Sequence, residues 1–419
     1  MKLYNFNFKE KPGRTYGKYH GDVEFMLDDK PFKGHCINSD DSFYVELEDG
    51  VGLKMIKDNE SRYGTLQEAS ENINHFKEKK VSIFPEVIDH NIDGNHLLMK
   101  VKHLGKPLLR DEETHSQMPS WMPERDHPFA KRELQAPLSL LSKLNNAFLE
   151  EKITPEDEWC KKDNIIGDKI IDFHRFKVDK NRYEIPTQAS REDCQKIYDN
   201  AVKRYLSKGD NKWKGKIYQG HTFSNGFSFE GYSSDGRNFD SYRKLNFYYM
   251  NKAKGKKVLD LGCNEGFFST QASLAGAKSV TAVDLYDHDI ELASEIRDEI
   301  TGLKNIEYIQ GDAVDFVKND TGKYHLTFLS SVLHQIYPHT KGAEDFIANI
   351  ARRTEYLCFE STANHKLMNI SLKQMKEFFS KFFHRVRFLF AYDAYSTGYR
   401  VIFMCWNPRH NKLGIHNEL

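Results

Sequence analysis

The sequence predicts a carboxyl-terminal α/β domain, built on a doubly wound parallel sheet with an antiparallel edge, and an amino-terminal α+β domain. Two observations support this prediction. From about residue 256 onward, apolar strand-like runs alternate with helix-like segments, as in parallel sheets covered by helices. Before that point, short strand-like runs are joined by tight turns. The 419 residues are enough for two or three domains.

The composition narrows the class of protein. Lys plus Arg and Asp plus Glu both number 61, so the formal net charge is zero, which disfavours a protein dedicated to binding duplex nucleic acid. The six cysteines lack metal-binding spacing, and we expect reduced thiols in a cytoplasmic protein. No apolar signal core is present, and no stretch approaches the roughly 20 apolar residues of a membrane span.

The carboxyl-terminal elements are expected in a regular order. Apolar runs predict strands at 256–262, 279–285, 305–313, 324–336 and 356–362, and helical spacing predicts helices at 267–277, 287–302, 343–352 and 371–383. Residues 384–406 are expected to form two strands joined by a loop. Such a hairpin would add the antiparallel edge.

A glycine turn, DLGCNEG at 260–266, follows the first of these strands. Gly262 and Gly266 permit unusual backbone dihedrals and a close approach to a ligand. Asn264 tolerates the left-handed conformation better than most residues, so we expect the turn to persist without a third glycine. Ligands of doubly wound sheets bind beyond the carboxyl ends of the strands, where this turn lies.

Two acidic residues end the next two predicted strands. Asp284 lies 18 residues after Gly266, where an acidic side chain accepts hydrogen bonds from ribose hydroxyls. Asp312 ends the third predicted strand, from which it can reach an adenine edge. The sequence therefore predicts a nucleoside-containing cofactor.

Four motifs follow one another in an order and at spacings that resemble those of class I S-adenosylmethionine-dependent methyltransferases. They are the turn, Asp284, "GDA" at 311–313 and "SSVLHQI" at 330–336. The resemblance covers about 215–407, and it departs from the family pattern at the middle glycine. It implies a Rossmann-like fold and S-adenosylmethionine as cofactor. The cofactor-binding residues it implies are Asp260, Gly262, Asn264, Gly266, Asp284, Asp312, Ala313 and Ser330.

The catalytic candidates depend on the acceptor. A hydroxyl acceptor needs a general base, for which His334 is well placed after the fourth strand, although a structural histidine is an alternative. An anionic acceptor needs no base but needs cations, and Arg237, Lys244 and Arg400 are candidates. The segment 218–249 resembles the one that covers the cofactor pocket in small-molecule and transfer-RNA wobble-uridine methyltransferases. Within it, Arg237 and Tyr242 are candidates for cofactor or substrate contact.

The amino-terminal elements are a hairpin around Asp49-Gly50, a polar helix at 65–79, and two strands around Asp93-Gly94. This order resembles the small lobe of the protein-kinase and aminoglycoside-kinase superfamily. The resemblance implies that Lys54 on a strand pairs with Glu68 on the helix and holds ATP phosphates.

A second kinase-like stretch, "DNIIGDKIIDF", places Asn164 and Asp172 on what resemble the paired strands of lipopolysaccharide-core sugar kinases, where an amide and a carboxylate hold Mg²⁺. The stretch departs from the kinase pattern, because no glycine-rich loop precedes Val45 and Trp159 stands where the catalytic-loop aspartate belongs. An active kinase, a degenerate kinase-like domain and another fold all remain open.

We therefore expect a kinase-like domain at 1–185, a helical connector at 186–216 and a methyltransferase domain at 217–410. Together they resemble enzymes that cap bacterial surface polysaccharides with phosphate and methyl groups. The expected acceptor is a saccharide, with or without a phosphate group, or a small metabolite, with ATP and Mg²⁺ as further cofactors if the kinase is active. The alternatives are an RNA methyltransferase with an amino-terminal substrate-binding module and a non-catalytic, cofactor-sensing interaction protein.

Overall fold

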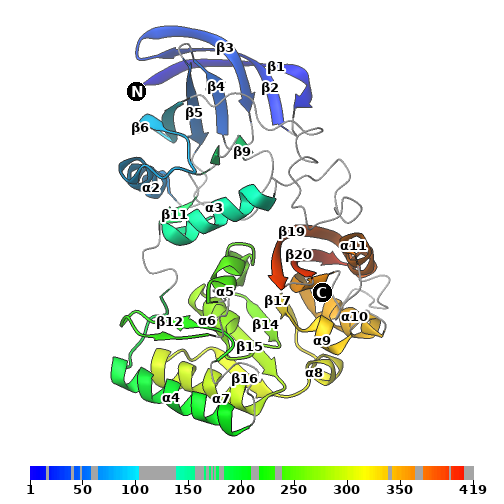
Figure 1. Ribbon diagram of the computed structural model, residues 1–419. Helices are drawn as coiled ribbons and strands as arrows, with labels where there is room; N and C mark the ends of the chain where they lie inside the picture. Colours follow the sequence, from blue (N-terminus) through cyan, green and yellow to red (C-terminus); the bar gives the residue numbers. More distant parts are fainter. Residues whose placement is uncertain are drawn as a thin grey trace. The chain divides into compact units, whose positions relative to one another are not determined.

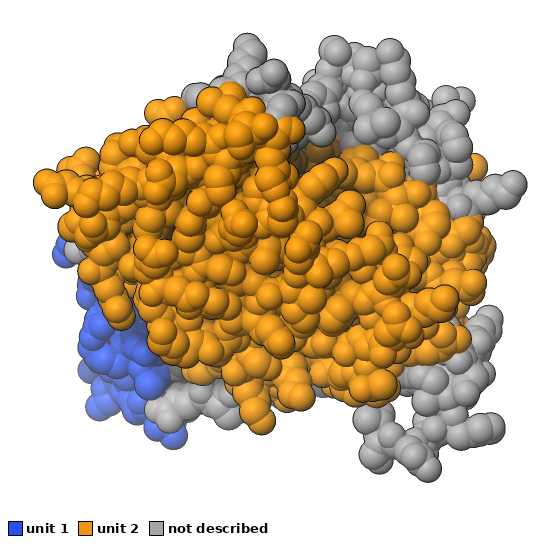
Figure 2. Space-filling view, turned by 90° about the horizontal axis from the view of Figure 1, so that it is seen from below, with its two compact units in different colours: residues 1–117, 131–180 blue, residues 118–130, 181–419 orange. Residues whose placement is uncertain are grey.

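The computed structural model forms two compact units, residues 1–117 with 131–180 and residues 118–130 with 181–419, which Figure 2 colours separately. Figure 1 gives the order of the helices and strands. The structure describes residues 1–15, 18–38, 42–47, 50–57, 65–102, 138–155, 165–166, 169–170, 173, 176–178, 184–208, 217–231, 238–337, 342–363, 371–395 and 398–409.

The first unit contains an antiparallel seven-stranded sheet in the order β1-β2-β3-β4-β5-β7-β6. Its helices are α2 (Leu66–Lys79) and α3 (Leu138–Glu150). Two small ladders pair β8 (Ile153–Thr154) with β11 (Lys177–Val178), and β9 (Ile165–Ile166) with β10 (Lys169–Ile170). The sheet strands are β1 (Leu3–Thr15), β2 (Lys18–Leu27), β3 (Lys30–Asn38), β4 (Ser42–Glu46), β5 (Val51–Lys57), β6 (Val87–Asp93) and β7 (His96–Lys102).

Local sequence explains the central elements of this unit. Gly50 lies between the paired strands β4 and β5, and Gly94 lies between the paired strands β6 and β7. Their φ angles are positive, at 69° and 58°. Helix α2 begins with a capping box between Thr65 and Glu68. The sequence predicted these two hairpins and this helix, but it did not predict the antiparallel extension formed by β1, β2 and β3.

The second unit contains the predicted α/β sheet, in the order β16-β15-β14-β17-β18-β20-β19. The first five strands are parallel, and β20 pairs antiparallel with both β18 and β19, which gives the predicted antiparallel edge. These strands are β14 (Lys257–Leu261), β15 (Ser279–Asp284), β16 (Ile306–Gln310), β17 (Tyr324–Ser330), β18 (Thr354–Ala363), β19 (Phe383–Tyr395) and β20 (Gly398–Pro408).

Helices connect these strands (Figure 1). They are α6 (Phe267–Leu274), α7 (Asp287–Glu295) with its π-helical continuation η7 (Ile296–Thr301), α8 (Ala313–Asn319), α9 (Leu333–Ile336), α10 (Ala343–Arg353) and α11 (Leu372–Ser380). The segment before β14 contributes β12 (His221–Thr222), β13 (Ser228–Phe229), α5 (Asn238–Leu245) and η6 (Met250–Ala253).

Two predicted strands end earlier than expected. The third ends at Gln310, because the Asp312 side chain accepts the N–H groups of Val314 and Asp315 and starts α8 as its N-cap. The fourth ends at Ser330, so His334 lies on the short helix α9 rather than on a strand.

Helix α4 (Arg191–Ser207) lies in the region predicted as a connector, but it packs alongside α7 (Figure 1). One apolar stripe of this otherwise polar helix is buried in the second unit. No helix in the part of the chain that the structure describes is long and apolar enough to cross a membrane. The buried cluster around α4 contains Ile185, Cys194, Ile197, Ala201, Tyr205, Ile217, Phe223, Phe229, Leu292, Ile296 and Ile300.

Phe328 on β17 tests the packing of the second unit. Its side chain is fully buried, with ring centroids 5.6 Å from Tyr248 and 6.0 Å from Phe268. Phe328→Ala should lower the free energy of unfolding by about 3–5 kcal/mol through the cavity it leaves, as measured by urea denaturation. Leu206→Ala, at a site that is 47% exposed, is the control and should change it by less than about 0.5 kcal/mol. Equal effects of the two substitutions would contradict this packing.

Candidate active site

The glycine turn lies between β14 and α6 and contains three left-handed residues. Gly262, Asn264 and Gly266 have φ angles of 72°, 53° and 77°. The prediction that Asn264 adopts this conformation is confirmed. A Cβ atom on Gly262 would lie 2.1 Å from Val332 Cγ2, and one on Gly266 would lie 2.3 Å from the Tyr308 hydroxyl. Both glycines are therefore required by backbone conformation and by packing.

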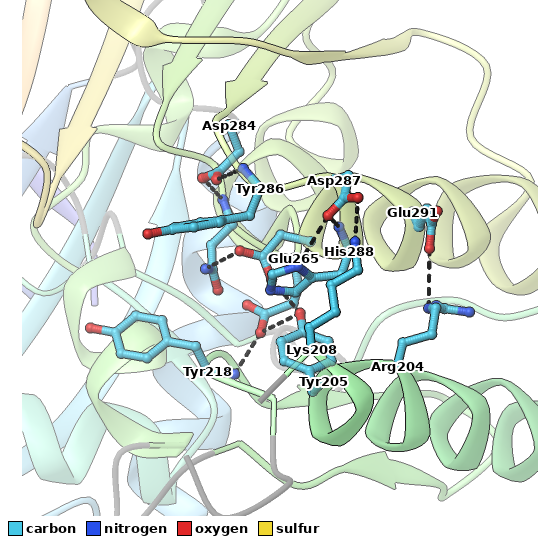
Figure 3. Close-up of polar contacts among 12 residues, drawn as sticks. Arg204, Tyr205, Lys208, Tyr218, Glu265, Asp284, Tyr286, Asp287, His288 and Glu291 are labelled. Atoms are coloured by element: carbon cyan, nitrogen blue, oxygen red, sulfur yellow. Dashed lines mark hydrogen bonds and ion pairs between the residues drawn. The ribbon is translucent and has the colours of Figure 1, made fainter. Parts of the chain in front are cut away.

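Asp284 ties the end of β15 to this turn. Its Oδ2 atom accepts the backbone N–H of Asn264 at 2.8 Å, and its Oδ1 atom accepts the N–H of Tyr286 at 3.1 Å. Burial raises the pKa of Asp284, although these backbone N–H groups oppose the shift. The carboxylate thus lies beside the turn (Figure 3).

Asp260 links strand β14 to helix α6. Its side chain is 1% exposed and accepts a hydrogen bond of 2.6 Å from the Ser269 hydroxyl. Burial raises the pKa of Asp260 to about 7, while the Ser269 hydrogen bond opposes the shift and the charge of Asp284 adds to it. Asp260 therefore fixes the direction in which the chain leaves the strand.

These residues fit a nucleoside cofactor. The Oδ1 atom of Asn264 is buried without a hydrogen-bond partner among the described residues, as expected for an acceptor that a ligand would satisfy. The backbone N–H of Gly311 donates to the carbonyl of Asp284 at 2.8 Å, which brings Asp312 and Ala313 to the neighbouring strand end. The carboxylate of Asp312 is engaged in capping α8.

Glu265 is a site residue that the sequence analysis missed. It lies inside the turn, is completely buried, and accepts the backbone N–H groups of Tyr218 at 2.5 Å and Gln219 at 3.2 Å. The Gln219 side chain in turn accepts the N–H of Phe267, the first residue of α6, at 3.2 Å. The segment before β14 is thereby fixed to the turn (Figure 3). The sequence feature that could have revealed Glu265 is its position as a carboxylate between an apolar strand and an apolar helix.

Polar residues also gather at the ends of β17 and β18. Ser330 Oγ lies 2.6 Å from the Tyr248 hydroxyl. His334 is 4% exposed, and its Nδ1 atom lies 3.0 Å from Ser361 Oγ. Tyr242, a contact candidate, instead accepts the backbone N–H of Thr222 at 3.0 Å through its buried hydroxyl.

The structure brings Lys244 and Arg400 together on one buried carboxylate. Glu360 lies 3.3 Å from Lys244 Nζ and 2.9 Å from Arg400 Nη1, and it accepts the Ser331 hydroxyl at 2.6 Å. Burial alone would raise the pKa of Glu360, but Arg400 and Lys244 outweigh it and the pKa is lowered. Ser331 has a left-handed φ of 63°, unusual for a residue with a side chain. Arg237 lies outside the described residues.

The kinase-like candidates lie in the first unit. Lys54 is on β5 and is 6% exposed. The Glu68 carboxylate accepts the backbone N–H of Thr65 at 3.0 Å and so closes the capping box of its own helix. Asn164 and Asp172 lie outside the described residues. Within the described ranges, no group of three or more His, Cys, Asp or Glu side chains is arranged to hold a metal ion.

The shifted pKa of Asp260 predicts a pH-dependent stability. A folded-state pKa of about 7 lies above the unfolded value of about 4, so this carboxyl favours folding below pH 4 and the benefit is lost as the pH rises through 7. Between pH 5 and 8.5, the melting temperature of the wild-type protein should fall by roughly 5 °C more than that of Asp260→Asn, measured calorimetrically without cofactor. Parallel curves would contradict the assignment.

Comparison with known proteins identifies the fold around this turn. A family profile described as "Methyltransferase domain" matches residues 252–384. The ribosomal RNA large subunit methyltransferase K/L of Shewanella loihica is 39% identical over 80 residues, which are 19% of this chain and 11% of that protein. The chain thus matches only about a ninth of the length of this curated relative.

Among solved structures, the bifunctional kinase-methyltransferase WbdD aligns with a TM-score of 0.39 and 18% identity, covering 49% of this chain and 46% of that one. The N-terminal domain of EvdMO1, solved in the presence of SAH and D-fucose, aligns with a TM-score of 0.36 and 12% identity. The alignment covers 49% of this chain and 97% of that one. Together with the family match, the geometry of the turn shows that residues 252–384 form an S-adenosylmethionine-dependent methyltransferase domain.

Proposed function

We propose that the whole chain is a methyltransferase that transfers a methyl group from S-adenosylmethionine to an anionic saccharide or small metabolite. The observation that carries the proposal is the left-handed turn at Gly262, Asn264 and Gly266, held against the carboxylate of Asp284. This arrangement lies at the carboxyl end of the sheet, where doubly wound folds bind their ligands.

The cofactor, when bound, supplies an electrophilic methyl group. The residues of this chain then act by positioning, which is a large part of catalysis in a displacement reaction. Asp284 would accept the ribose hydroxyls, and the left-handed turn would let the backbone approach the cofactor closely. Asn264 Oδ1 is a further acceptor on the same turn.

The strand order supports a position for the acceptor. Strand β14, which carries the turn, lies between β15 with Asp284 on one side and β17 on the other. If the nucleoside lies over β15 and β16, the reactive end of the cofactor lies towards β17 and β18. Lys244 and Arg400 meet on Glu360 in that half of the sheet. Paired cations there support an acceptor with a phosphate or carboxylate group, such as a phosphorylated saccharide.

A hydroxyl acceptor would need a base, and His334 is the candidate for it. Its Nδ1 atom is hydrogen-bonded to Ser361 Oγ, which orients the ring for such a role. The candidates are buried to a similar degree, because Lys244 and Arg400 are 6% and 7% exposed and His334 is 4% exposed. The anionic acceptor is favoured because the two cations share the single negative charge of Glu360.

An RNA acceptor is the second candidate, because the curated relatives are named as ribosomal RNA methyltransferases. The formal net charge of zero is evidence against it. The two cases differ in their dependence on salt: RNA binding would weaken steeply between 50 and about 200 mM salt. A non-catalytic, cofactor-sensing protein would bind the cofactor but would transfer label to no glycan, metabolite or RNA pool.

For the first unit we propose a kinase-like domain, either active or serving as a substrate module. The antiparallel strands β4, β5, β7 and β6 and the helix α2 have the order expected of a kinase small lobe. Lys54 lies on β5, as the resemblance implies for an ATP-binding lysine.

Calorimetric titration of the full chain with S-adenosylhomocysteine and with ATP–Mg²⁺ tests both proposals. Binding of both ligands supports a bifunctional enzyme and makes a phosphorylated saccharide the first acceptor to try. Binding of S-adenosylhomocysteine alone makes the first unit a scaffold or substrate module. If S-adenosylhomocysteine does not bind, the proposed function is wrong.

Gly262→Ala tests the turn. It should weaken S-adenosylhomocysteine binding at least about tenfold, because the new Cβ atom meets Val332 and the left-handed φ is unfavourable for alanine. The double variant Gly262→Ala/Val332→Ala removes the clash but not the backbone strain, so it should recover only part of the affinity. Unchanged affinity in the single variant would show that the turn does not bind the cofactor.

A further inference from the structure

Tyr205 lies on α4, outside the residues that match the methyltransferase profile, yet its hydroxyl reaches the turn (Figure 3). The side chain is 2% exposed. Its hydroxyl donates to Asp289 Oδ1 and lies 3.3 Å from Glu265 Oε1. One phenol therefore contacts two buried carboxylates from two different elements.

Both carboxylates hold the turn in place. Glu265 accepts the N–H groups of Tyr218 and Gln219, as described above. The other, Asp289, accepts the side-chain N–H of Asn264 at 3.0 Å through Oδ2. Asn264 is thus fixed by its backbone to Asp284 and by its side chain to Asp289. The left-handed conformation of Asn264 depends on a carboxylate that Tyr205 hydrogen-bonds.

Ion pairs fix the position of Tyr205. The neighbouring residue Arg204 lies 2.8 Å from Glu295 and 3.3 Å from Glu291 on α7, and Lys208 pairs with Asp287 at the start of that helix. Several bonds between α4 and α7 therefore hold the phenol against the carboxylates. Burial raises the pKa of Tyr205, with the charges of Glu265 and Asp289 adding to the shift, so the hydroxyl remains a donor at neutral pH.

We propose that Tyr205 is a positioning residue for the cofactor: its hydroxyl bridges Asp289 and Glu265 and so keeps Asn264 and the segment 218–219 in the geometry that binds S-adenosylmethionine. This inference rests on the proposed function, because it assigns the turn to that cofactor. It adds a residue that acts through the turn without itself lying on it.

The phenol also separates charges. Burial, and then the charge of Asp289, raise the pKa of Glu265, and without the phenol no hydroxyl would bridge these two acidic side chains. A higher pH favours the ionised form of Glu265, so the repulsion from Asp289, and with it the effect of losing the phenol, should be larger at pH 8.5 than at pH 6. The titratable and charged groups facing this pair come from α4, the turn, its two flanking strands, α7 and the segment before β14: Arg204, Tyr205, Lys208, Tyr218, Asp260, Cys263, Asp284, Asp287, His288, Glu291 and Glu295.

The test is calorimetric titration of the full chain with S-adenosylhomocysteine at pH 6.0 and 8.5. Tyr205→Phe should weaken binding by about tenfold at pH 8.5 and by clearly less at pH 6.0. Tyr198→Phe is the matched control, because it removes a hydroxyl from the same helix that donates to the Glu230 carbonyl at 3.0 Å. The control should bind like the wild type at both pH values.

A second variant covers the case in which Tyr205→Phe does not fold. Asp289→Leu roughly keeps the size of the side chain but removes both acceptor oxygens, so neither the Tyr205 hydroxyl nor the Asn264 amide keeps its hydrogen bond to this position. It should weaken binding at least about threefold at pH 8.5. Wild-type affinity in either folded variant, or an equal loss at both pH values in Tyr205→Phe, would overturn the positioning role while leaving the proposed function intact. A wild-type protein that binds no S-adenosylhomocysteine would overturn both.

Discussion

Three left-handed residues within five positions are the constraint around which the second unit is organised. Gly262, Asn264 and Gly266 turn the chain from β14 into α6. Such a conformation is costly for residues with side chains and persists only where its surroundings hold it. Here the surroundings are buried carboxylates: Asp284 and Asp289 hold Asn264.

The electrostatics of the sheet end divide at β14. On the side of β15 lie carboxylates whose pKa is raised by burial, among them Asp284. On the side of β17 and β18, Glu360 has a lowered pKa because Arg400 and Lys244 surround it. Burial thus favours the neutral form of Asp284 on the first side, whereas two cations keep Glu360 ionised on the second.

The sequence predicted the parallel sheet, its antiparallel edge and the turn, because each depends on short-range signals: apolar runs, glycines and an asparagine. It did not predict that Glu265 and Tyr205 belong to the site. Their hydrogen bonds join residues about 50 to 80 positions apart, and no local periodicity encodes such a pairing. The same limit explains α4: a polar sequence with one apolar stripe does not reveal the surface on which that stripe packs. Asp312 was assigned to a strand end because capping geometry becomes visible only once the following helix is known.

The cluster that contains Ile197, Tyr205 and Ile296 has a consequence for how this chain can be divided. The recognisable family segment begins at residue 252, but one wall of its core is supplied by residues from 185 onward. A fragment cut at 252 would expose the inner face of α7 to water and leave two buried carboxylates without their phenol. The smallest segment that can carry this fold is therefore longer than the segment that matches the family profile. Recombination at residue 252 would separate α4 from the core that it completes.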